Sequence, residues 1–82
     1  MNKQNIKNGM IACYWGKGQD STYIGVYETL DNAVSALRSF FHGITHSASP
    51  MQVCLYELVV EDNGFVHEGK LLEESPEWKF YN

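Results

Sequence analysis

The stretch that decides the fold is TLDNAVSALRSFF, residues 29–41. Its apolar residues recur every three or four positions, the spacing of one buried stripe on an α-helix. Thr29 is suited to cap the helix, Asp31 lies in the first turn, where negative charge is favourable, and Gly43 predicts the helix end. The stripe comprises Leu30, Ala33, Val34, Leu37, Phe41 and Ile44.

The residues on both sides of this helix are typical of β-strands. Before it, Met10–Trp15 and Thr22–Tyr27 are strand-like and are joined by a glycine-containing loop. After it come Met51–Glu61, the most apolar segment, and Phe65–Leu72, joined by the turn sequence Asp62-Asn63-Gly64. The order β-β-α-β-β predicts an α+β two-layer sandwich, with a four-stranded, mainly antiparallel sheet and one helix on one face.

Two strand orders fit this pattern: 2-1-3-4, antiparallel throughout, and 1-2-3-4, with a parallel middle pair. The first and third strands are the most apolar, which suits central positions, so we favour 2-1-3-4. In the second strand we expect Ile24 and Val26 to face the helix and Tyr23 and Tyr27 to face the other way. The third strand has apolar residues at both alternating sets of positions, so both of its sides should be buried. The open face of the sheet, which is the face away from the helix, should therefore be covered, either by the chain's own tail or by a partner.

A single domain is expected over residues 1–82, because this length supports only one small core. Residues 1–9 are polar, show no secretory signal and could be flexible. Residues 73–82 form an aromatic tail, in which Ser75-Pro76-Glu77 is typical of a helix start with serine as the cap. We expect a short helical turn there that directs Trp78 and Phe80 back at the body of the protein.

Composition excludes several classes of protein. A chain that is 44% hydrophobic and 13% aromatic is too apolar for a disordered tail. No apolar run reaches the roughly 20 residues that a membrane-spanning helix needs, so we expect a soluble, cytoplasmic protein. Ten acidic against six basic residues give a net charge of −4. An acidic surface disfavours nucleic acid and would suit a basic partner surface.

No motif predicts catalysis, a cofactor or a metal. Gly16-Lys17-Gly18 is followed by strand-like residues, not by the helix that a phosphate loop requires, so it is interpreted as a hairpin loop. His42 and His46 are separated by a glycine that ends the helix, and no further metal ligand is near them in sequence. Cys13 and Cys54 are expected to be buried and reduced, with sulfurs that could be close if their strands are neighbours.

The segments VYETLDNAVSALRSFF (residues 26–41) and VCLYELVVEDNGFV (residues 53–66) together resemble short acidic accessory proteins of bacteriophages and mobile elements. The resemblance lies in length, acidity, the single helix and the hairpin. It implies a stoichiometric inhibitor of a host defence system, CRISPR effectors included, that binds a protein or sequesters a signal molecule. Residues 56–81, YELVVEDNGFVHEGKLLEESPEWKFY, are faintly similar to the end of small ADP-ribosyltransferase-like domains, a fold for which the chain is too short.

We therefore expect a non-enzymatic inhibitor that binds a protein partner. We expect a homodimer or a tight complex with another protein, because the second face of the sheet is apolar and the strand Thr22–Tyr27 has no charged residue. The alternative is a small-ligand binder, a nucleotide sponge or sensor that uses tyrosine and tryptophan rings with Lys17 or Arg38.

Glu73, Glu74 and Glu77 are expected to form a solvated acidic face. The candidate partner-binding residues are Tyr23, Tyr27, Arg38, Glu57, Glu73, Glu74, Glu77, Trp78, Phe80 and Tyr81.

Overall fold

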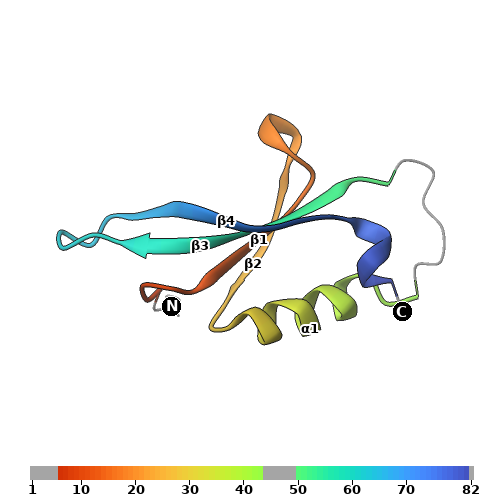
Figure 1. Ribbon diagram of the computed structural model, residues 1–82, viewed down its shortest axis with the longest axis horizontal. Coiled ribbons are helices and arrows are strands. Elements are labelled where there is room, and N and C mark those ends of the chain that lie inside the picture. Colours follow the sequence, from red (N-terminus) through yellow and green to blue (C-terminus); the bar gives the residue numbers. More distant parts are fainter. Residues whose placement is uncertain (1–5, 44–49, 82) are drawn as a thin grey trace, which may run out of the picture.

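The computed structural model describes residues 6–43 and 50–81 of the chain. A four-stranded sheet carries one helix on one face, and a short 3-10 turn follows the last strand (Figure 1). This is the α+β fold expected from the sequence. The elements are β1 (Ile11–Trp15), η1 (Gly18–Asp20), β2 (Thr22–Tyr27), α1 (Leu30–Phe40), β3 (Gln52–Val60), β4 (Val66–Pro76) and η2 (Glu77–Phe80). Ile44 and His46 lie outside the described residues.

The strands follow the order β2-β1-β3-β4, and every neighbouring pair is antiparallel. The predicted order 2-1-3-4 is therefore confirmed, and the two most apolar strands, β1 and β3, lie at the centre. Figure 1 also shows the outer part of the β3–β4 hairpin projecting past α1 at one end of the molecule. The fold measures 43 × 24 × 23 Å along its principal axes, so this arm makes it elongated.

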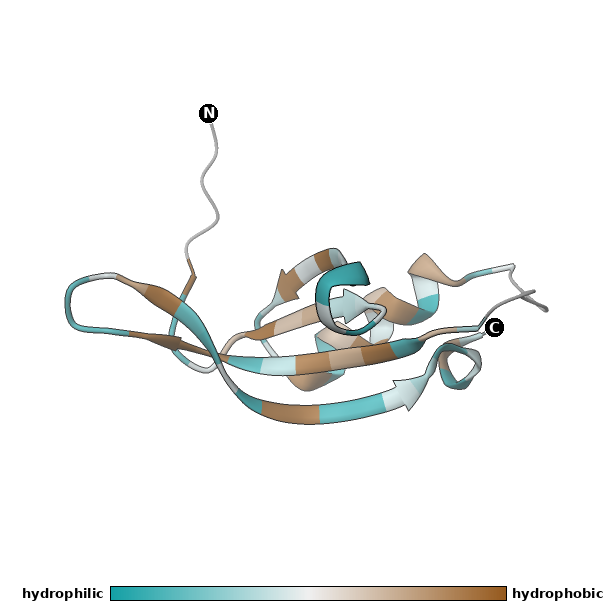
Figure 2. Ribbon diagram, turned by 90° about the horizontal axis from the view of Figure 1, so that it is seen from above, coloured by the Kyte–Doolittle hydropathy of each residue, from teal (hydrophilic) through white to brown (hydrophobic). Residues whose placement is uncertain are grey.

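Apolar side chains form a buried cluster on each face of the sheet, and Figure 2 shows hydrophobic stretches in brown along its strands. The main core lies between the sheet and α1, and its buried members are Ile11, Cys13, Ala33, Leu37, Phe41, Val53, Leu55 and Phe80. A smaller cluster of Met10, Ala12 and Leu58 contains no helix residue and lies on the opposite, open face. Ile6, Tyr14, Val26 and Val66 pack against this second cluster. The C-terminal tail joins the main core and so leaves the open face to other residues.

The helix begins as predicted. Thr29 Oγ1 accepts a hydrogen bond from the backbone N–H of Asn32 at 3.1 Å, which satisfies one of the free amides of the first turn. Leu37 and Phe41 are fully buried, but Leu30 is 42% exposed, so its assignment to the buried stripe was wrong. Leu30 is the first residue of the helix, a turn before the positions that pack on the sheet.

The pairing of β1 with β2 contains one irregularity. Cys13 pairs with Gly25, whereas the next residue, Tyr14, pairs with Tyr23. Ile24 is therefore left without a partner in β1, which is the pattern of a β-bulge. An extra residue moves every side chain beyond it to the other face of the sheet, because side chains alternate with a period of two.

The bulge corrects the predicted faces of β2. Ile24 and Tyr27 both pack against the helix-side core, whereas Val26 packs on the open-face cluster. The expected orientations of Val26 and Tyr27 were thus reversed, and that of Ile24 was right. Gly25 makes this possible, because a Cβ at that position would lie 2.7 Å from the hydroxyl of Tyr27.

The last strand is longer than predicted, and the start of the C-terminal turn differs. Residues up to Pro76 pair with β3, with Ser75 opposite Val53, so their backbone stays extended. Ser75 does not cap the turn: its hydroxyl donates to the carboxylate of Glu73 at 2.6 Å. The turn itself begins at Glu77, with Pro76 preceding it as a cap without a side-chain hydrogen bond.

Candidate partner-binding site

Three tyrosines form a row across the open face, one from each of β2, β1 and β3. Tyr14 lies between Tyr23 and Tyr56, with ring centroids 5.9 Å from each. The interplanar angles are 60° and 80°, the edge-to-face arrangement that aromatic pairs favour. Tyr23, at the edge of the sheet, is 55% exposed.

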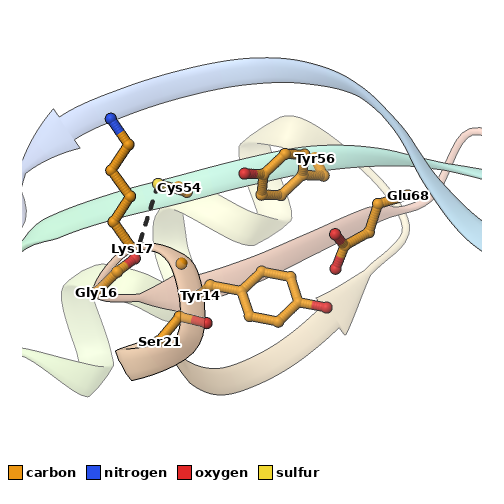
Figure 3. Close-up of a pocket in the computed structure, with 8 residues that line it drawn as sticks. Tyr14, Gly16, Lys17, Ser21, Cys54, Tyr56 and Glu68 are labelled. Carbon is orange, nitrogen blue, oxygen red and sulfur yellow. Dashed lines mark hydrogen bonds between the residues drawn. The ribbon is translucent and has the colours of Figure 1, made fainter.

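Two adjoining hollows follow this row, and we call them together the open-face groove. The smaller hollow has a volume of about 160 Å³ and is lined by Tyr14, Gly16, Lys17, Gly18, Ser21, Cys54, Tyr56 and Glu68 (Figure 3). The larger hollow has a volume of about 380 Å³ and is lined by Ile6, Ala12, Tyr14, Tyr23, Val26, Leu58, Val66, His67 and Glu68. Tyr14 and Glu68 line both, so the two hollows lie next to each other on the same face.

Glu68 carries the negative charge inside the groove. Burial, followed by a hydrogen bond with Glu68, raises the pKa of Tyr14 to about 12, so this phenol stays protonated and can donate to the carboxylate. Figure 3 shows the Tyr14 hydroxyl and the Glu68 carboxylate on the same side of the hollow. Within residues 6–43 and 50–81, the ion pairs join Lys17 to Glu74, His67 to Glu61 and Lys79 to Glu73, and Glu68 takes part in none of them.

The cation at the rim of the smaller hollow is already paired. Lys17 Nζ lies 2.8 Å from the carboxylate of Glu74, and this hydrogen bond raises the pKa of the Lys17 ammonium group. In the larger hollow, His67 Nε2 lies 2.7 Å from the carboxylate of Glu61. The groove therefore contains no unpaired cation from the described part of the chain that could receive a phosphate.

Burial holds the thiols of both cysteines in the protonated form. Cys54 Sγ donates a weak hydrogen bond to the Gly16 carbonyl at 3.8 Å, and burial raises the pKa of its thiol. Burial also raises the pKa of Cys13 to about 11. Both cysteines are free and buried, as predicted. Cys54 pairs with Tyr14 and Cys13 with Leu55, so the two sulfurs lie on opposite faces of the sheet instead of close together.

Glu77 is the main correction among the predicted binding residues. It is fully buried, with one carboxylate oxygen accepting from Trp15 Nε1 at 3.0 Å and from the backbone N–H of Met51 at 2.7 Å. The hydroxyl of Tyr81 donates to the other oxygen. Burial works to raise the pKa of Glu77, but these three donors outweigh it and the pKa is lowered. Glu77 was expected to lie in a solvated acidic face. It is instead buried and holds Trp15, Met51 and Tyr81 together through hydrogen bonds, an arrangement that we call the Glu77 clamp.

The tail places its aromatic residues differently from the prediction. Phe80 is 2% exposed and belongs to the core, which excludes it as a contact for a partner, and Tyr81 is half-buried near the ring of Phe41. Trp78 is 61% exposed and points away from the core. The cause is the 3-10 geometry of η2, in which residues three apart share a face, so Glu77 and Phe80 point inward together.

The remaining candidates are dispersed. Glu73 forms an ion pair with Lys79 and accepts a hydrogen bond from the Ser75 hydroxyl. Glu74 forms an ion pair with Lys17 at the rim of the groove. Arg38 is exposed in the last turn of α1, on the other side of the sheet. Glu57 is half-buried and lies opposite Ile11 in the register of β3 with β1. Tyr27 lies on the helix side of the sheet. Of the predicted set, the structure brings only Tyr23 into the lining of the open-face groove.

The prediction missed the groove residues that carry its aromatic and charged character besides Tyr23 and Lys17, namely Tyr14, Tyr56, His67 and Glu68. The alternation of side chains along the central strands could have placed two of them, Tyr14 and Tyr56, on the open face. Tyr14 is in phase with Ala12, and Tyr56 is in phase with Cys54 and Leu58, so all belong to the face opposite the helix.

Neither a metal centre nor a membrane span is found in the part of the chain that the structure describes. No group of three or more His, Cys, Asp or Glu residues there could hold a metal ion. His42 is exposed. No described helix is long and apolar enough to cross a membrane.

Comparison of the chain with protein-family models, curated proteins and solved structures gives no significant match.

Proposed function

We propose that this chain is a non-enzymatic binding protein of the inhibitor type that holds a basic surface of a protein partner in the open-face groove. The observation that carries the proposal is the combination, on one face of the sheet, of three tyrosine rings, an apolar floor and Glu68, an acid that forms no ion pair with any described residue. Tyrosine contributes large contact area at interfaces at a low entropy cost and can hydrogen-bond at its tip.

The charge of the chain supports a basic partner. The net charge of −4 attracts positive surfaces and repels phosphate. Glu68 lies within the groove, and the Glu61 and Glu74 carboxylates border it through their contacts with His67 and Lys17. Proteins that bind nucleic acids carry basic surfaces, which makes such a protein, including a host-defence effector, a suitable partner.

The alternative, a nucleotide sponge or sensor, has less support. Its phosphate group would need a free cation near the tyrosine rings. Lys17 is bound to Glu74, and Arg38 lies on the helix, across the sheet from the groove. A phosphate beside Glu68 would be repelled.

A random-peptide library displayed on phage and panned against the purified protein tests the proposal. We expect the enriched peptides to be basic and to lose most of their binding to the Tyr23→Ala variant. Trp78→Ala is the matched control, because it removes an aromatic side chain of similar exposure, 61% against 55% for Tyr23, outside the groove. Enriched peptides without a basic bias, or equal binding to both variants, would contradict the proposal.

Thermal denaturation with a panel of nucleotides tests the alternative. A specific ligand at a hundredfold excess over its Kd stabilises the folded state by about 2.7 kcal/mol. We expect no such stabilisation. A raised melting temperature with one nucleotide would favour the sponge instead.

A further inference from the structure

The smaller hollow of the open-face groove combines aromatic rings with a carboxylate in a space that suits one flat cation. We propose that it is a subsite for an arginine side chain, with Tyr14 and Tyr56 as aromatic walls and Glu68 as the counter-charge. The inference rests on the proposed function and names the anchor residue of the partner.

The arrangement of the walls favours a cation. The rings of Tyr14 and Tyr56 meet at 80° with centroids 5.9 Å apart, and Figure 3 shows both rings and the Glu68 carboxylate around the same space. A cation within about 6 Å of a ring centroid is attracted by the negative face of the ring. The volume of about 160 Å³ has room for several water molecules, and therefore for a guanidinium group.

The charges around the hollow also favour a cation. The charged residues that line it are Glu68 and Lys17, and the Lys17 ammonium is neutralised by Glu74. Tyr14 and Cys54 stay protonated, because burial raises both pKa values, and so add no charge. Counting Lys17, Glu74 and Glu68 together leaves one negative charge, contributed by Glu68.

Arginine fits these groups better than lysine. A guanidinium group is planar, stacks on aromatic rings and is more weakly hydrated than an ammonium group. Its N–H groups form a fork that matches the two oxygens of a carboxylate, and Glu68 has no cation bound to it among the described residues. A lysine ammonium would gain only a point contact at the same place.

The test is an NMR titration of the full-length protein with 13C-labelled tyrosine rings. The probes are Nα-acetyl-arginine amide, Nα-acetyl-lysine amide and Nα-acetyl-citrulline amide, the last being nearly the same shape as arginine without the charge. We expect arginine to shift the Tyr14 and Tyr56 ring signals in a saturable way, lysine to bind several-fold more weakly and citrulline to produce no saturable shift. Equal shifts with citrulline, or none with arginine, would overturn the subsite.

Matched variants assign the binding to the hollow. Glu68→Gln should weaken arginine binding roughly tenfold, which corresponds to about 1.4 kcal/mol. Asp31→Asn removes the same charge from the helix on the other face and should change the affinity less than twofold. Tyr56→Leu removes an aromatic wall while keeping an apolar side chain, and should also weaken binding. Unchanged affinity in both Glu68→Gln and Tyr56→Leu would overturn the assignment.

The outcome separates this inference from the proposed function. If basic peptides still bind through Tyr23 while the arginine probe fails, the subsite is wrong and the proposed function stands. If the arginine probe binds but the library gives no basic peptides, the subsite stands and the proposed function is wrong.

Discussion

The indole N–H of Trp15 donates a hydrogen bond of 3.0 Å to the carboxylate of Glu77, 62 residues later in the chain. This contact joins the end of β1 to the C-terminal turn. The same carboxylate also receives the backbone N–H of Met51 and the hydroxyl of Tyr81. One buried acid therefore fastens three separate parts of the chain together.

Replacing Glu77 by glutamine should destabilise the fold. The amide keeps the shape but loses the charge, and its NH₂ group cannot accept from Tyr81 or from the pair of N–H donors. Hydrogen bonds to charged groups contribute about 1.5–3 kcal/mol each, so we expect a loss of about 2–3 kcal/mol in urea unfolding. Glu28→Gln, at an exposed acid outside the clamp, should cost less than about 0.5 kcal/mol. Equal costs for the two variants would contradict the clamp.

The Glu77 clamp should also make stability fall in acid. The pKa of Glu77 is lower in the folded protein than its ordinary value of 4.5. Its contribution is therefore fully present above pH 4.5 and is lost as the pH falls through the lower, folded-state pKa. The difference in unfolding free energy between the natural chain and Glu77→Gln should shrink between pH 6 and pH 3. A constant difference, measured by urea unfolding at each pH, would show that the charge is not responsible.

The two large aromatic residues of η2 should respond differently to truncation. Phe80→Ala opens a cavity in the main core and should cost about 3–5 kcal/mol. Trp78→Ala removes an exposed ring and should change stability by less than about 0.5 kcal/mol. Thermal and urea unfolding of both variants provide the measurement. A large loss with Trp78→Ala would place this ring against the body of the protein.

His67 should titrate above its ordinary pKa of 6.5, chiefly because the Glu61 carboxylate binds its imidazolium form. Stabilisation by this pair is fully present below pH 6.5 and is lost as the pH rises through the higher, folded-state pKa. An NMR titration of the His67 ring protons measures the pKa directly. In Glu61→Gln the pKa of His67 should fall towards 6.5. An unchanged His67 pKa in that variant would contradict the pairing.

The fold could be predicted because it depends on local patterns. The spacing of Ala33, Leu37 and Phe41 indicated a helix, and the apolar character of β1 and β3 indicated the central strands. The bulge at Ile24 could not be predicted in this way. It depends on how β2 pairs with β1, and a single unpaired residue reverses the side chains that follow it.

The site was less predictable than the fold. Glu77 resembles a surface acid in sequence, since its three donors come from residues 15, 51 and 81. Tyr14 and Tyr56 could have been placed on the open face by simple alternation. Glu68 could have been placed by counting from the predicted Asp62-Asn63-Gly64 turn, because the pairs from Val60–Val66 to Leu58–Glu68 follow in unbroken register. The residues of β4 beyond Glu68 could not, because the β3–β4 pairing shifts register twice between Leu55 and Leu58.

The projecting arm of the β3–β4 hairpin implies a gradient of rigidity along the long axis of the molecule. Near Leu58 and Val60 the arm is held by hydrogen bonds with Gly9 and Asn8, whereas the tip around Phe65 is exposed. In amide hydrogen exchange, the tip should therefore exchange through small local openings, and the amides of Cys13 and Leu55 only through global unfolding. A partner in the open-face groove would therefore contact the rigid part of the arm, where Val66 and His67 pair with Val60 and Val59, and the more flexible tip would lie beyond it.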